Sequence, residues 1–339
     1  NEMIGIQSVP VIADAILKDI KGFNYERAYL AIKNSMMSDY KGLSYVTGKE
    51  YIPADLENES VAKGLEYAIA DWGVAQVAKK LDKSEDYRYF SERALAYHKY
   101  WDKDTHFFRG RNSDGSWLTP FDPVRSTHRN DAYCEGNAWQ YTWLVPHDVE
   151  GLISLFGSEN AFVEKLDSLF LVNEDLGNDA SPDISGLIGQ YAHGNEPGHH
   201  TAYLYAYVGE QWKTAEKVDY ILSNMYSALP DGLQGNEDCG QMSSWYVFSS
   251  LGFYPVNPSN GVYVFGRPIF DKVVLDLPDG KAFEICTVNN SKENKYIQSA
   301  ELNGQEYLKS YITHADIMNG GTLVFIMGDK PNKKFGWDM

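Results

Sequence analysis

Apolar residues along the first 250 positions recur at three- and four-residue spacing, which predicts a succession of helices. The segment 58–81 has one apolar face, formed by Val61, Leu65, Ala68, Trp72 and Ala75. The segment 84–101 repeats the spacing, and Ser84 is placed to cap it. Six more helices are expected at 131–145, 147–156, 158–172, 198–208, 211–227 and 240–252.

Short links between neighbouring helices favour antiparallel pairs. Ten or so helices over residues 1–256 therefore suggest a toroid or a bundle of helical hairpins. Two long irregular stretches, 103–130 and 173–197, interrupt the helices. Long structured loops of this kind often carry function.

From about residue 258 the apolar period changes to two, which predicts strands. Asn303-Gly304 is a strong signal for a two-residue hairpin. Residues 257–339 are thus expected to form a small antiparallel β domain, and the fold class is α+β, mostly α. The expected strands are 262–265, 272–277, 282–288, 296–302, 306–312 and 322–327.

The composition narrows the possible partners. The 339 residues carry a formal net charge of −17, which argues against a nucleic-acid partner.

Aromatic residues make up 14% of the chain. Their rings can stack on sugars, although packing between helices is their commoner role. The three cysteines form no disulfide or zinc pattern. No apolar run is long enough to span a membrane. No signal peptide is visible, but the chain starts at Asn1, so secretion stays open.

Two motifs combine a carboxylate with glycine and aromatic residues. The first is Glu135–Tyr141, which includes Trp139, and the second is Gly235–Trp245, which includes Asn236, Glu237 and Asp238. Two separated carboxylates suit glycosidic-bond hydrolysis, one as acid and one as base. The structural alternatives are a helix-dipole contact for Glu135 and an N-cap for Asp238.

A third motif, His193–His200, contains three histidines but lacks zinc spacing. Asn195 and Glu196 offer hard oxygen atoms, which suit calcium better. A turn that caps the next helix is the simpler interpretation of this motif. Asp122 is by default a turn residue, although it could contact a substrate.

Together these motifs resemble glycoside hydrolase family 92, the calcium-dependent exo-acting α-mannosidases. The resemblance runs over nearly the whole chain and is highly specific. The residues that carry it are Glu135–Tyr141 with Trp143, Val145–Asp148, Gln190–Pro197, His199–Tyr205, Gly235–Trp245 and Gly252–Pro255.

The resemblance implies that residues 1–256 form an (α/α)₆-barrel-type helical toroid that lacks its first helices. It also implies an inverting mechanism on α-linked mannosides, with Glu135 as the general acid and Asp238 as the general base. It places calcium at Asn195 and Glu196. Substrate contacts are expected at His193, Asn236, Glu237, Asp122 and Trp139. Some family members carry an acid where this chain has Asn236, and certain α-1,2-specific members carry a glutamate where it has Gly194. The linkage preference is therefore open.

Family members are about twice this length and begin with a β-sandwich. We therefore expect this chain to be a C-terminal portion whose partner is the missing N-terminal β-sandwich, in a protein that is secreted, periplasmic or at the cell surface. Two alternatives remain. One is a catalytically silent carbohydrate-binding or structural fragment, and the other is a different (α/α)-barrel glycosidase.

Overall fold

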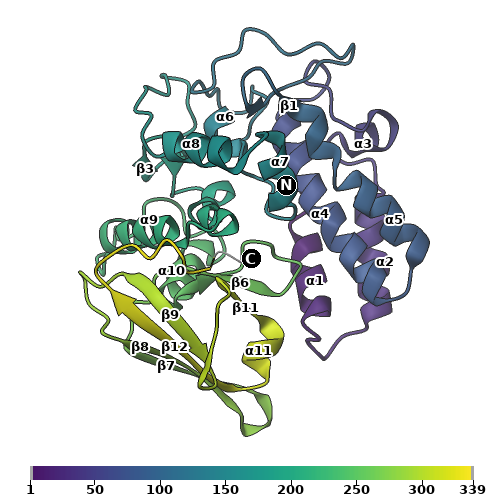
Figure 1. The fold of residues 1–339 in the computed structure, drawn as a ribbon. Helices are drawn as coiled ribbons and strands as arrows, with labels where there is room; N and C mark the ends of the chain where they lie inside the picture. The colour runs from purple at the N-terminus through teal and green to yellow at the C-terminus, as the bar shows by residue number, and fades with distance from the viewer. Residues whose placement is uncertain (1–2, 337–339) are drawn as a thin grey trace. The chain divides into compact units, whose positions relative to one another are not determined.

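The computed structural model describes residues 3–336, which form a mixed α+β protein with two compact units (Figure 1). The first unit runs up to Gly198 and also takes in Asn257–Asn260. The second comprises His199–Val256 and the residues from Gly261 onward. The division into domains 1–256 and 257–339 stays a prediction. No barrel or toroid is identified among residues 3–336.

The first unit is built around one long buried helix, α4 (Ser60–Lys80), which packs against α1, α2 and α5 (Figure 1). Of the predicted apolar face, Val61, Leu65, Ala68 and Ala75 are buried and Trp72 is partly buried. The structure also buries residues on the other sides of α4, including Lys63 and Asp71. The surrounding helices are α1 (Ser8–Leu17), α2 (Tyr25–Met36), α3 (Leu43–Lys49) and α5 (Ser84–Arg93).

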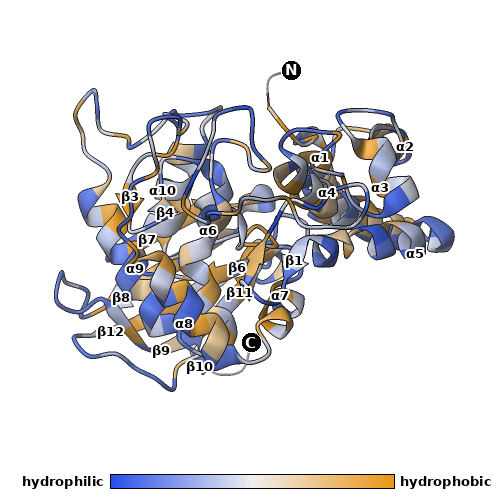
Figure 2. Ribbon diagram, turned by 90° about the horizontal axis from the view of Figure 1, so that it is seen from above, coloured by the Kyte–Doolittle hydropathy of each residue, from blue (hydrophilic) through white to orange (hydrophobic). Residues whose placement is uncertain are grey.

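Two expected helices are shorter than predicted. α5 begins at Ser84 without a side-chain cap, and a 3₁₀ helix, η1 (Ala96–Tyr100), replaces its last turn. The helix expected over 131–145 is reduced to α6 (Ala138–Tyr141), because Glu135 has a left-handed φ of 50° and Asn137 caps the helix. Helices α7 (Val149–Leu155) and α8 (Glu159–Leu169) are confirmed; Figure 2 shows polar and apolar residues on different sides of α8.

The rest of the first unit is largely irregular, as predicted. This part of the unit contains two short strand pairs and ends in one turn of 3₁₀ helix. These elements are β1 (Trp101–Asp102) with β2 (Phe107–Phe108), β3 (Leu187–Ile188) with β4 (Tyr191–Ala192), and η2 (Glu196–Gly198).

The second unit combines helices with two sheets. Its helical elements are η3 (Thr201–Val208), which is 3₁₀ in geometry, α9 (Gln211–Asn224), α10 (Gln241–Leu251), η4 (Pro278–Gly280) and α11 (His314–Met318). Its strands are β5 (Phe253–Tyr254), β6 (Val262–Phe265), β7 (Lys272–Asp276), β8 (Ala282–Val288), β9 (Tyr296–Leu302), β10 (Gln305–Glu306), β11 (Tyr311–Thr313) and β12 (Gly321–Gly328).

The larger sheet has the strand order β10-β9-β12-β8-β7. The hairpin at Asn303-Gly304 is confirmed, since both residues have positive φ (54° and 76°) and join β9 directly to β10. The prediction of an all-antiparallel β domain is wrong for one strand pair, because β12 runs parallel to β8. Strand β12 lies between β8 and β9 and is antiparallel only to β9.

Candidate functional site

Glu135 lies in a turn just before α6, in the first unit. Its φ of 50° is left-handed, a conformation that costs a non-glycine residue about 1–3 kcal/mol and persists only where the surroundings enforce it. The side chain is half-buried. Glu135 therefore does not sit on the helix, and a helix-dipole contact within α6 does not explain it.

Buried hydrogen bonds hold this turn in place. Asn137 and Gln140 form a capping box, and Asn137 Nδ2 also donates to Gln190 Oε1 at 2.9 Å. The amide of Asn195 donates to the Glu135 carbonyl at 2.9 Å. A Cβ on Gly136 would lie 2.6 Å from the ring of Tyr141, so only glycine fits there. The turn is thus fixed by packing as well as by hydrogen bonds.

Asp238 lies in an exposed turn of the second unit, before α10. Asp238, Cys239 and Gly240 have consecutive left-handed φ values of 42°, 58° and 91°. The N-cap of α10 is Gly240, with no side-chain capping bond, so the structural alternative of Asp238 as N-cap is wrong. Strain without a capping role is a reason to suspect function at Asp238.

Glu237 and Asn236 are exposed neighbours of Asp238. The Glu237 carboxylate accepts hydrogen bonds from the backbone N–H and the hydroxyl of Ser243, at 3.0 and 2.8 Å. Glu237 therefore ties the turn to the first turn of α10. These contacts give it a positioning role, and its predicted contact with substrate stays a prediction, as does that of Asn236.

Two histidines of the third motif have ring partners within their own units. His193 is fully buried, with Nδ1 2.9 Å from the Tyr191 hydroxyl. His199 Nδ1 lies 3.1 Å from Gln241 Nε2, and its carbonyl accepts from the indole of Trp245. Gln241 is the first residue of α10, so His199 anchors the helix that follows Asp238.

The predicted calcium ligands are Asn195, which is buried, and Glu196, which is half-buried and begins η2. The side-chain nitrogen of Asn195, Nδ2, donates its hydrogen bond to the Glu135 carbonyl. The side-chain oxygen, Oδ1, is the Asn195 atom that can bind a cation. By donor type both residues fit calcium. Within residues 3–336, no three His, Cys, Asp or Glu side chains gather in a metal-holding group.

Trp139 is only 8% exposed and packs edge-on to Phe107, with Lys165 Nζ 4.3 Å from its ring centroid. Burial lowers the pKa of Lys165 to about 8. Asp122 is exposed, and its carboxylate accepts from the Val124 N–H, which confirms its turn role. Direct sugar contact by either residue stays a prediction.

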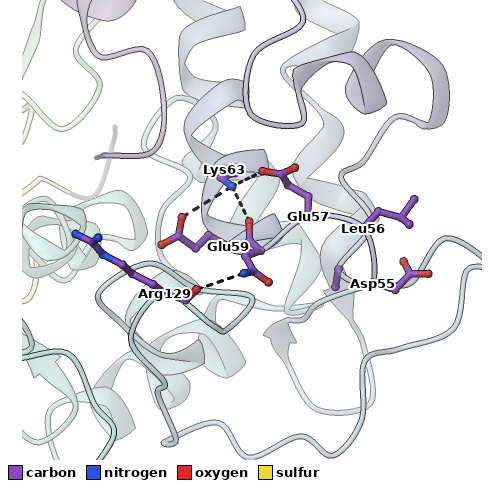
Figure 3. Close-up of a pocket in the computed structure, with 8 residues that line it drawn as sticks. Asp55, Leu56, Glu57, Glu59, Lys63 and Arg129 are labelled. Carbon is purple, nitrogen blue, oxygen red and sulfur yellow. Dashed lines mark hydrogen bonds and ion pairs between the residues drawn. The ribbon is translucent and has the colours of Figure 1, made fainter. Parts of the chain in front are cut away.

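A pocket of about 500 Å³ in the first unit contains none of the predicted site residues (Figure 3). The sequence did not predict this charged pocket, because its lining comes from segment 54–59, from Lys63 in α4 and from Arg129, which together form no sequence motif. The pocket is lined by Ala54, Asp55, Leu56, Glu57, Asn58, Glu59, Lys63 and Arg129. A capping signal, Asn-x-x-Gln at Asn137, could have placed the start of α6.

No helix within residues 3–336 is long and apolar enough to cross a membrane. The three cysteines are unpaired; Cys134 is buried and Cys239 is exposed.

Comparison with known proteins identifies the family and the fold. An α-mannosidase of family GH92 from Bacteroides thetaiotaomicron, solved in complex with mannoimidazole, is 45% identical, with a TM-score of 0.95 over 99% of this chain and 45% of that chain. A family GH92 inverting mannosidase from the same organism is 34% identical, with a TM-score of 0.89 over 99% of this chain and 47% of that one.

An uncharacterized secreted glycosidase from Arthroderma benhamiae is 29% identical over 94% of this chain and 44% of its own length. The chain thus spans less than half the length of these relatives. Residues 1–329 match the glycosyl hydrolase family 92 catalytic domain. The chain belongs to glycosyl hydrolase family 92.

Proposed function

We propose that the protein containing this chain is an inverting exo-α-mannosidase, and that this chain supplies both of its catalytic carboxylates. The observation that carries the proposal is the placing of Glu135 and Asp238 on left-handed turns, with φ of 50° and 42°, in a family 92 chain. The family 92 relatives named above are described as an α-mannosidase and an inverting mannosidase, which supports the same activity here.

In the proposed mechanism the Glu135 carboxyl protonates the departing glycosidic oxygen. The Asp238 carboxylate removes a proton from a water molecule, which attacks the anomeric carbon from the opposite face of the mannose. Configuration therefore inverts. Inversion requires room for that water, so the two carboxyl groups should be roughly 6.5–9.5 Å apart.

Asn195 and Glu196 would hold calcium through their side-chain oxygens. Bound calcium would polarise neighbouring sugar hydroxyls and favour a flattened ring. The side-chain amide nitrogen of Asn195 also donates a hydrogen bond to the Glu135 carbonyl. The same side chain therefore connects the proposed calcium ligands with the turn that contains Glu135.

We further propose that the helices form part of an (α/α)₆ toroid, and that an N-terminal β-sandwich outside this chain completes the sugar pocket. The substrate is an α-linked mannose of a glycan. Export to the periplasm, cell surface or medium fits a glycan substrate and the relative named as secreted.

The test measures mannose release from α-mannobiosides by the full-length gene product and by this chain alone, each with and without EDTA. We expect activity of the full-length protein to fall on chelation and to recover with Ca²⁺. NMR of the first-formed product should show β-mannose. First-formed α-mannose would contradict inversion, and activity insensitive to EDTA would contradict the calcium assignment.

A further inference from the structure

We propose that Lys63 is a positioning residue for the general acid, acting through the segment 57–59 on the turn that carries Glu135. The inference rests on the proposed function, because it assumes that Glu135 is the acid. Lys63 lies in the first turn of α4, and its side chain is only 5% exposed (Figure 3).

The buried ammonium of Lys63 holds the three residues that precede α4. Its Nζ donates to Glu57 Oε1 at 2.6 Å and to the Asn58 carbonyl at 2.7 Å, and it lies 3.9 Å from Glu59 Oε2. Figure 3 shows the two carboxylates and the Asn58 carbonyl around Nζ. Burying a charged group is costly unless it is paired and hydrogen-bonded. Within residues 3–336, the hydrogen bonds and ion pairs of this ammonium all go to segment 57–59.

Segment 57–59 and the start of α4 are hydrogen-bonded to residues 129–132, which lead to Glu135. The Glu59 N–H donates to the Asp131 carbonyl at 2.6 Å, and Asn58 Nδ2 donates to the Arg129 carbonyl at 3.3 Å. The first amides of α4, at Val61 and Ala62, both donate to the Ala132 carbonyl. A carbonyl of the acid's own segment therefore caps α4.

The Glu59 side chain continues this connection. Glu59 has a left-handed φ of 57° at the N-cap position, yet its carboxylate does not cap α4. It faces the Cys134 thiol instead. Burial, and then the charge of the Glu59 carboxylate and a hydrogen bond to it, raises the pKa of that thiol. Cys134 immediately precedes Glu135, so the series of contacts that runs from Lys63 through Glu59 to Cys134 ends one residue from the acid.

Loss of the ammonium would leave the Glu57 and Glu59 carboxylates close together without their cation. Their repulsion would open segment 57–59 and release residues 129–134. The Glu135 carboxyl would then move away from the position in which it can protonate the glycosidic oxygen. Displacements of about 1 Å can cost roughly 100-fold in rate. Asp238 lies in the second unit and makes none of these contacts.

The test compares two α-mannosides with the full-length protein: methyl α-mannoside, whose leaving group needs a proton, and 2,4-dinitrophenyl α-mannoside, whose leaving group does not. For Lys63→Met we expect kcat/KM to fall roughly 10- to 100-fold on the methyl glycoside and to change less than about twofold on the activated one. Lys33→Met is the control, because it breaks an ion pair of 2.6 Å with Asp86 elsewhere in the unit; both substrates should be unaffected.

If Lys63→Met does not fold, Glu57→Gln decides, since it weakens one bond of the network and keeps the ammonium. It should show the same selective loss, about tenfold or less. Equal losses on both substrates in the variant that folds would overturn the proposal, because a general structural defect has no leaving-group preference. Glu135→Gln run in parallel separates the two hypotheses. If it also lacks that preference, the acid assignment has failed, and if it alone shows the preference, only the role of Lys63 has failed.

Discussion

The two turns that carry the candidate carboxylates are built in opposite ways. The Glu135 turn is fixed by buried groups of the first unit, namely the side chains of Gln190 and Asn195, which are distant in sequence, and the nearby ring of Tyr141. The Asp238 turn is exposed, and Glu237 and Ser243, close by in sequence, tie it to α10. Both turns nevertheless force a non-glycine residue into left-handed backbone.

This difference indicates what each group needs. A general acid must be aimed at one oxygen atom and must hold its proton, so a rigid and partly dry setting suits it. A general base works on a water molecule, so an exposed setting is compatible with its role. We therefore expect changes near Glu135 to disturb the fold as well as the chemistry, and changes near Asp238 to disturb chemistry more than fold.

The largest expected effect is on activity. Asp238→Asn should lower kcat roughly 10²- to 10⁴-fold for both good and poor leaving groups, because the base is needed in either case. Steady-state kinetics of the full-length protein measure it, and thermal unfolding should be nearly unchanged because the side chain is exposed. The control is Asp231→Asn, an exposed aspartate of the same loop. Full activity of Asp238→Asn would remove Asp238 from the mechanism.

The next effect is acid sensitivity of the first unit. His147 is buried, and burial lowers its pKa from 6.5 to about 4; Nε2 lies 3.0 Å from the Ala94 carbonyl. The unfolded chain takes up a proton that the folded chain resists, so stability is lost as pH falls from 6.5 towards 4. The loss should reach roughly 3 kcal/mol.

Urea unfolding at several pH values measures this loss. His147→Gln can keep the bond to the Ala94 carbonyl and should flatten the pH dependence. His128→Gln, at an exposed position, should not. An unchanged slope in His147→Gln would contradict the assignment.

A third pair of variants separates packing from backbone conformation. Gly136→Ala should cost about 1–3 kcal/mol, because its Cβ meets the Tyr141 ring at 2.6 Å. Gly240→Ala meets no atom within 4 Å but requires a φ of 91°, which costs about 1–2 kcal/mol.

Second variants distinguish the two causes in urea unfolding. Tyr141→Leu should absorb part of the Gly136→Ala cost, giving a non-additive double variant. Gly240→Asn should be milder than Gly240→Ala, because asparagine tolerates left-handed backbone. Additive costs at Gly136 and Tyr141 would show that the ring does not set the requirement for glycine.

The smallest effect is expected at the exposed turn. Ser243→Ala removes one hydrogen bond to Glu237 and should cost about 0.5–1 kcal/mol or less. Ser244→Ala, an exposed neighbour, should be neutral. A loss above about 2 kcal/mol, measured by thermal unfolding, would mean that the Asp238 turn is held as firmly as the Glu135 turn.

Much of the fold could be predicted from the sequence, because local period decides local structure. Strands β6, β8 and β9 match their predicted ranges, and Asn303-Gly304 forms its hairpin. The parallel pairing of β12 with β8 could not be predicted, since alternation shows which face is buried and not which strand lies beside it.

The chemistry of the site could be predicted only in part. Motifs with glycine and carboxylates pointed to Glu135 and Asp238. The spacing of apolar residues, however, predicted a helix through Glu135, and this prediction is wrong because the backbone there is left-handed. Lys63 was missed because contacts between residues 57–63 and 129–134 bring together segments more than 65 positions apart. Nothing in the local pattern of either segment encodes that contact.

The most direct test of the account is the separation of the Glu135 and Asp238 carboxyl groups in an experimental structure of the full-length protein with a mannose-derived inhibitor bound. The account predicts that both groups face the anomeric carbon, from opposite sides, roughly 6.5–9.5 Å apart. A separation near 5 Å on one face of the sugar would indicate a retaining enzyme, and carboxyl groups on separate surfaces would contradict the assignment altogether.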